Sequence, residues 1–187
     1  MRPHVVSGAA VLLAVTGCIT AAGVSPAAQG QNPNLRTFEQ LVRTVAQATA
    51  PDALQIRVSW QLDRAVANPT AAVNRLDVID IERVTPGLSR DRRPGVSSQH
   101  IVVVSQDATG AELDWRAIVD PRVVRSESPA NGDLRGETLY YLDAELVLVV
   151  PALAATDSLS LYKVVSRDGV AALSPFGRVA IPPSALR

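Results

Sequence analysis

The sequence predicts an all-β fold, an antiparallel β-sandwich of seven or eight strands preceded by one helix. Short apolar and β-branched runs recur between turn-forming residues from residue 51 to residue 183. No helical stretch separates one run from the next, which favours antiparallel pairing over parallel sheets with helical crossovers. Only one stretch, before the first run, has the period of a helix. A closed barrel is the alternative architecture, and 187 residues suffice for one well-buried domain.

The first 27 residues have the features of a signal or anchor segment. A basic residue precedes an uncharged apolar run from Val5 to Gly17, as in a secretory signal. Residues 15–18, Val-Thr-Gly-Cys, resemble a bacterial lipobox, in which Cys18 carries the lipid. Ser25-Pro26-Ala27 instead suits ordinary signal peptidase, and an uncleaved membrane anchor is the third alternative. All three place the domain outside the cytoplasm.

Residues 28–50 are expected to form a linker and an amphipathic helix. Thr37 and Gln40 have the spacing of a capping box, and apolar residues recur behind them at helical intervals. This pattern predicts a helix over Phe38–Thr49. Pro51 ends the helix, because the residue before a proline disfavours helical backbone.

Residues 51–187 are expected to form the sandwich domain. The first run alternates apolar and polar residues, which is typical of a strand with one solvated face. Turn signals at Asp107–Gly110 and at Asp168-Gly169 predict hairpins, and Ser128–Gly136 is predicted to be a loop. The predicted strands lie at Leu54–Leu62, Val73–Val84, His100–Gln106, Leu113–Val119 (resuming at Val123 and Val124 after the break at Asp120-Pro121), Leu139–Val150, Ser158–Val165, Val170–Leu173 and Arg178–Ile181.

The two most apolar runs, Leu139–Val150 and Ser158–Val165, are predicted to pair as a buried antiparallel hairpin. We assume a register in which Glu145 faces Lys163. One face then enters the core, and the other leaves an apolar patch that needs a cover. The Phe38–Thr49 helix is the preferred cover, because its apolar stripe is otherwise unexplained, and a partner protein is the alternative. The patch comprises Val147, Val149, Leu159 and Leu161.

In strand rhythm, residues 51–183 resemble the immunoglobulin-like or transthyretin-like accessory domains of secreted bacterial proteins. The resemblance implies a sandwich architecture and rests on no diagnostic motif, because the Cys-Trp-Cys pattern of true immunoglobulin domains is absent. Cys18 is the only cysteine. No disulfide can therefore form within the domain, and the hydrophobic core has to stabilise it.

Composition argues against several classes of function. The 18 basic and 18 acidic residues balance, so no positive face for nucleic acid is expected. His100 is the only histidine after the signal segment, which argues against multi-histidine metal sites. Glycine-rich phosphate loops are missing. We therefore expect no metal and no cofactor.

Two sets of residues would suit a hydrolase. Asp143 and Glu145 lie two apart on a predicted strand, at roughly 7 Å, a separation that a glycosidase pair can have. His100 would suit a serine nucleophile, although no Gly-x-Ser-x-Gly elbow occurs. Solvated carboxylates and a structural histidine are the commoner readings of such residues. The remaining charge clusters are expected to face solvent, namely Asp77, Asp80, Glu82 and Arg90–Arg93.

These observations favour an exported, non-catalytic β-sandwich with a structural or protein-interaction role at the bacterial envelope. The expected partner is an unidentified envelope protein, and a lipid on Cys18 would add a membrane contact. Two alternatives stay open. A small-ligand carrier would need an enclosed apolar cavity, and a hydrolase would need a concave cluster of perturbed acids around Asp143 or His100.

The lipid anchor gives a prediction that mass spectrometry of the intact mature protein can test. We expect the mature chain to begin at Cys18 and to carry the mass of the attached lipid, because Cys18 is at the lipobox position. An unmodified N-terminus near Ala28 would show that ordinary signal peptidase processes the chain.

Overall fold

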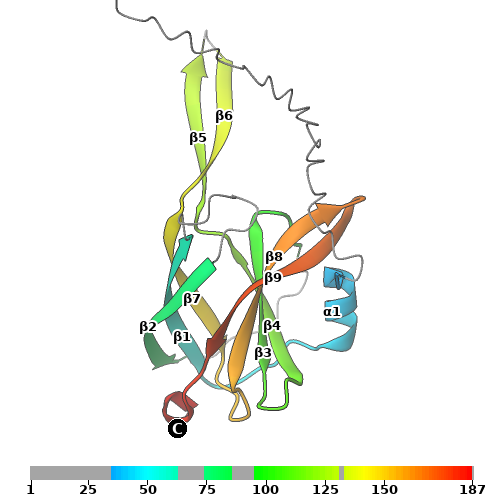
Figure 1. Cartoon of the computed structure of the whole chain (residues 1–187), viewed down its shortest axis with the longest axis vertical. Coiled ribbons are helices and arrows are strands. Elements are labelled where there is room, and N and C mark those ends of the chain that lie inside the picture. The colour runs from blue at the N-terminus through cyan, green and yellow to red at the C-terminus, as the bar shows by residue number, and fades with distance from the viewer. Residues whose placement is uncertain (1–34, 63–73, 86–94, 131–132, 187) are drawn as a thin grey trace, which may run out of the picture. The chain divides into compact units, whose positions relative to one another are not determined.

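The computed structural model describes residues 35–62, 74–85, 95–130 and 133–186, with only the backbone described at 126–130 and 133–137. These residues form one α-helix and nine strands, so the all-β fold with an N-terminal helix is confirmed (Figure 1). The elements are α1 (Phe38–Thr44), β1 (Ala53–Leu62), β2 (Asn74–Val84), β3 (His100–Gln106), β4 (Glu112–Val119), β5 (Val123–Ala130), β6 (Asp133–Tyr140), β7 (Asp143–Pro151), β8 (Ser158–Arg167), β9 (Val170–Ala180) and a 3₁₀ turn (Pro183–Leu186).

The strands pair antiparallel in three sheets. One sheet has the order β2-β1-β7 and a second has the order β4-β3-β8-β9, while β5 and β6 pair only with each other. The first two sheets are the layers of the sandwich, because one cluster of buried side chains draws on β1 and β7 from one sheet and on β3, β8 and β9 from the other.

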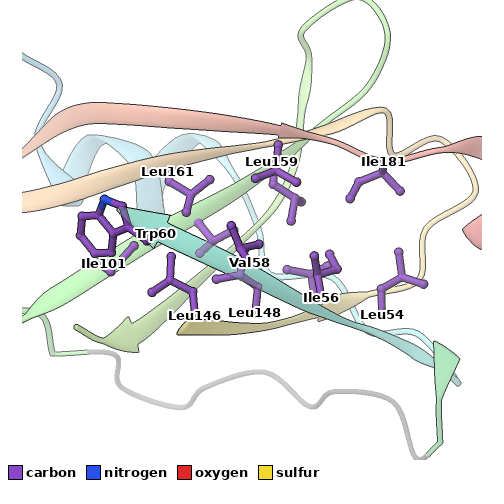
Figure 2. Packing of buried hydrophobic residues seen from close by; sticks show 13 residues of the cluster. Leu54, Ile56, Val58, Trp60, Ile101, Leu146, Leu148, Leu159, Leu161 and Ile181 are labelled. Carbon is purple, nitrogen blue, oxygen red and sulfur yellow. The ribbon is translucent and has the colours of Figure 1, made fainter. Parts of the chain in front are cut away.

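Alternation along the strands builds this core. In β1 every second side chain from Leu54 to Trp60 is fully buried, and Leu146, Leu148 and Val150 of β7 follow the same period. Figure 2 shows these side chains meeting Ile101, Leu159 and Leu161 of the four-stranded sheet. A strand whose alternate residues are apolar buries one face and leaves the other to solvent.

The four-stranded sheet is buried on its other face as well. Phe38, Leu41 and Val45 pack there in a second buried cluster with residues of β3, β4, β8 and β9. The rings of Phe38 and Trp115 meet edge to face, with their centroids 5.1 Å apart. Because both faces are covered, all five residues from Ile101 to Ser105 are buried, which explains the unbroken apolar run in the sequence.

The helix is shorter than predicted, ending at Thr44 instead of Thr49. The predicted capping box is present, with Thr37 and Gln40 bonded to each other's backbone amides. Beyond it, Val45 is extended, and its carbonyl oxygen accepts a 3.0 Å hydrogen bond from the Trp115 indole. The Ala48 amide donates to the Asp114 carboxylate, and the Ala48 carbonyl accepts from the Arg116 guanidinium, both in β4. These tertiary bonds replace the helical bonds that the local pattern favours.

The predicted hairpin of β7 with β8 is wrong, and so is its register. β7 pairs with β1, placing Leu148 opposite Ile56, and β8 pairs with β3 and β9 in the other sheet. The connection over residues 152–157 is hydrogen-bonded to both layers. The Ala152 amide donates to the carbonyl of Asp52, just before β1, and the Asp157 amide donates to the carbonyl of Gln106, at the end of β3. Such a connection is long enough to cross the roughly 10 Å between packed sheets.

Two other turn predictions have opposite outcomes. Asp168 and Gly169 have φ angles of 50° and 78°, so the Asp-Gly dipeptide does make the tight hairpin turn between β8 and β9. Ser128–Gly136, in contrast, is not a loop, because β5 and β6 pair from Val123↔Tyr140 to Ala130↔Asp133. Pro129 lies within β5, at a strand that pairs on one side only.

The two sides of α1 give a matched pair of variants. Leu41→Ala should lower the free energy of unfolding by about 2–5 kcal/mol, because Leu41 is fully buried against the sheet. Val42→Ala removes a side chain that is 39% exposed and should change it little. Urea denaturation of both variants measures the difference, and equal losses would mean that α1 does not cover the sheet in solution.

Candidate functional site

The four residues of the predicted apolar patch do not lie on one surface. Leu159 and Leu161 are fully buried between the two sheets, whereas Val147 is 47% exposed on the outer face of the three-stranded sheet. Val149 is half-buried on that same outer face. The helix covers the other sheet instead. The patch and its proposed cover were therefore wrong, because both depended on the β7–β8 hairpin.

The predicted carboxylate pair is on the surface and is tied to β1. Asp143 and Glu145 are both exposed. Arg57 binds Glu145 through two hydrogen bonds of 2.7 and 3.0 Å, and these bonds lower the pKa of Glu145. A glycosidase general acid needs a raised pKa instead, so this environment does not suit Glu145 to that role. The predicted contact of Glu145 with Lys163 is wrong, because the two residues belong to different sheets.

Ser97 lies beside His100, in the turn that precedes β3. The Ser97 hydroxyl and the His100 Nδ1 atom are 3.0 Å apart, but the Ser97 backbone amide also donates to Nδ1 at 3.0 Å. The His100 amide donates to the Ser97 carbonyl and closes the turn. The one lone pair of His100 Nδ1 already accepts a hydrogen bond from the Ser97 backbone amide. This geometry therefore suits a residue that caps a turn better than a general base.

A pocket of about 250 Å³ lies next to this turn, between residues 96–98 and strands β8 and β9. Three of its lining residues are serines, Ser97, Ser98 and Ser166. It borders the side of the four-stranded sheet that α1 covers, because Val164 lines it. Its volume is below the roughly 300–1,000 Å³ of common ligand pockets, and its lining is not that of an enclosed apolar cavity.

The charge clusters expected to face solvent do so wherever the structure describes them. Asp77, Asp80 and Glu82 are exposed on β2. Within the described ranges no three metal-ligating side chains come together, and no helix is long and apolar enough to cross a membrane. Arg90–Arg93 and Cys18 lie outside the described residues.

A run of four large apolar residues, Leu139 to Leu142, lies exposed where β6 ends and the chain turns into β7. We call it the 139–142 strip. The exposed fractions are 44% for Leu139, 62% for Tyr140, 57% for Tyr141 and 38% for Leu142. Isolated exposed apolar residues are ordinary, whereas exposed apolar residues that gather in one region of a surface are typical of an interaction site.

The sheet topology explains why the strip is exposed. Leu139 and Tyr140 end β6 at the root of the two-stranded β5–β6 sheet, which extends away from the sandwich in Figure 1, and neither belongs to the buried clusters of the sandwich. The backbone is nevertheless anchored. The Tyr141 amide donates to the Arg122 carbonyl at 2.9 Å, and the Leu142 carbonyl accepts from Leu62 at 3.2 Å. The strip is therefore presented on a fixed backbone.

Arg122 also belongs to a cationic cluster at this end of the core, which we call the Trp60 cluster. It comprises Trp60, Asp120, Arg122, Lys163 and Phe176. The Arg122 guanidinium stacks 3.3 Å from the Trp60 ring centroid and bonds to Asp120 at 2.9 Å. Phe176 stacks on Trp60 with centroids 4.7 Å apart. Burial lowers the pKa of Lys163, as does the positive charge of Arg122.

Known proteins supply no template for this arrangement. No family model, no curated protein and no solved structure matches the chain.

Sequence reasoning missed both the 139–142 strip and the Trp60 cluster. The strip was assigned to the buried hairpin because Leu-Tyr-Tyr-Leu has the composition of a core strand. Lys163 did carry a signal, since it is the only lysine and lies at even spacing from Leu159 and Leu161, which face the core. The assumed register instead directed it to Glu145.

Arg122 and Arg75 provide a test of the buried ion pair in the Trp60 cluster. Arg122→Ala should cost about 3–5 kcal/mol of unfolding free energy, because it leaves the Asp120 carboxylate buried without its cation. Arg75→Ala breaks an exposed pair with Asp77 and should cost less than about 1 kcal/mol. Denaturant titration compares the two, and similar losses would show that Asp120 is solvated once Arg122 is removed.

Proposed function

We propose that this chain is an exported β-sandwich domain that binds another protein at the bacterial envelope through the 139–142 strip. The exposure of four consecutive large apolar side chains on an anchored backbone carries the proposal. Tyrosines supply large contact area at a low cost in side-chain entropy and are enriched in protein interfaces. A partner that covers Tyr140 and Tyr141 would remove this apolar surface from water.

The sheet that bears the strip adds a second support. Among the described strands, β5 and β6 pair only with each other, so each has an outer edge with unpaired backbone groups. Open edges accept an extended segment of another chain by main-chain hydrogen bonding. Such an edge next to apolar side chains favours a polypeptide partner over a small ligand.

The export part of the proposal rests on the first 27 residues, with the lipid on Cys18 as the preferred attachment. The contacts of the fold begin by Arg36, whose carbonyl accepts from Leu173 at 2.8 Å and whose side chain pairs with Glu112. The intervening chain could span at most roughly 60 Å when extended. A lipid on Cys18 would therefore keep the domain within that distance of a membrane surface.

Site-specific photocrosslinking in intact cells tests the binding surface. A photoreactive residue at position 140 or 141 should crosslink to a discrete envelope protein, because these side chains would lie inside the interface. The matched control is position 170, where Val170 is 46% exposed at the start of β9, directly after the Asp168-Gly169 turn. Crosslinks of equal yield at 170, or none at 140 and 141, would contradict the proposal.

The same partner then serves a quantitative test. The double variant Tyr140→Ser/Tyr141→Ser should weaken its binding by more than about tenfold, since buried interface tyrosines commonly contribute over 1.4 kcal/mol. The melting temperature should stay near that of the wild type, because both side chains are exposed in the free protein. Unchanged affinity would place the interface elsewhere.

A further inference from the structure

Lys163 has an unusual environment for a lysine, because it is half-buried beside two aromatic rings. Its side chain projects from β8 on the core side, half-buried, with Nζ 5.2 Å from the Trp60 ring centroid and 5.6 Å from that of Phe176. It makes no hydrogen bond or ion pair with the residues that the structure describes. The three N–H donors of the ammonium therefore lie near two aromatic rings, and no described residue accepts a hydrogen bond from them.

Arg122 leaves a second donor unused. Its Nε and Nη2 atoms and its backbone amide all donate to Asp120, whereas Nη1 makes no hydrogen bond within the described part of the chain. Both cations lie over the same Trp60 ring. The Trp60 cluster contains two cations, Arg122 and Lys163, and one carboxylate, Asp120. One positive charge of the cluster is therefore left uncompensated.

This excess charge is unfavourable without a ligand. A partly desolvated ammonium that lacks acceptors loses hydration, and a neighbouring guanidinium repels it. The lowered pKa of Lys163 reflects those two causes, burial first and Arg122 second. The cation–π contact with Trp60 offsets only part of this cost.

An oxyanion would resolve this imbalance. Its oxygens would accept from the unused donors, and its charge would neutralise the cluster. We propose that Lys163 Nζ and Arg122 Nη1 form a binding site for a small oxyanion, a carboxylate or a phosphate, at the Trp60 end of the sandwich. The Trp60 ring is fully buried, with Phe176 stacked 4.7 Å and the Arg122 guanidinium 3.3 Å from its centroid, so it offers no free face on which a planar ligand could stack. The site uses the Arg122 side chain, whereas the 139–142 strip is held by the Arg122 backbone carbonyl, and neither proposal requires the other.

Thermal unfolding of the purified protein tests this site with two probes, inorganic phosphate and acetate, each against sodium chloride at equal ionic strength. At least one probe should raise the melting temperature along a saturable curve, because a ligand that binds only the folded state stabilises it. In Lys163→Met the saturable rise should disappear or require about tenfold more anion, as expected for the loss of a charged hydrogen bond. Whichever probe saturates identifies the class of oxyanion.

Phosphate also stabilises proteins without binding, so the variant needs a matched control. Arg43→Met removes an exposed cation of α1 and should keep the full saturable response. An equal response in Lys163→Met and the wild type, or no saturable response to either probe, would overturn the proposal and leave the cation–π contact as the whole role of Lys163.

The single lysine permits an independent readout. Reductive methylation with formaldehyde and cyanoborohydride modifies amines, and Lys163 is the only lysine, so peptide mass spectrometry follows one side chain. The probe that saturates, at ten times its dissociation constant, should slow methylation of Lys163 by about tenfold, because only about a tenth of the sites stay free. An unchanged rate would show that the anion binds elsewhere.

Discussion

The structure depends on covering both faces of the β4-β3-β8-β9 sheet. One face packs on the three-stranded sheet, and the other packs on the short helix α1. The central strand β3 therefore has no solvated side from Ile101 to Ser105. Because α1 has only seven residues, it cannot be stable alone and exists through its contacts with the sheet. The fold is a three-layer arrangement in which the central strand of the middle layer is buried on both faces.

Two buried ion pairs of the same kind lie where connecting segments attach to these layers. Asp114 with Arg116 and Asp120 with Arg122 are both Asp-x-Arg pairs with almost no solvent exposure. The first pair binds the amide and carbonyl of Ala48, in the segment between α1 and β1. At the second pair, the Arg122 carbonyl holds the amide of Tyr141. Buried ion pairs specify a position more than they add stability, and here each one positions backbone that no strand ladder holds.

Local patterns in the sequence predicted most of the strands and the β8–β9 turn, but neither the β5–β6 pairing nor the partner of β7. Period-two alternation identified β1, and the Asp168-Gly169 dipeptide identified the β8–β9 turn, because both signals are local. The partner of β7 was missed because it lies about 90 residues away in β1, and no local pattern encodes that choice. The end of α1 was missed for the same reason, since side chains of β4 decide it. The exposed strip and the Trp60 cluster followed from these pairings, so they could not be assembled before the topology was known.

The pairing of β1 with β7 also sets the order in which the chain can fold. Ala53 pairs with Pro151, so the three-stranded sheet cannot close until most of the domain has been synthesised. The hairpins β3–β4 and β8–β9, in contrast, close short loops and can form early. Domains dominated by such distant pairings fold in milliseconds to seconds. The inner face of β1, including Trp60, lacks much of its cover until the still later strands β8 and β9 complete the opposite sheet, so the core is the last part of the domain to become dry.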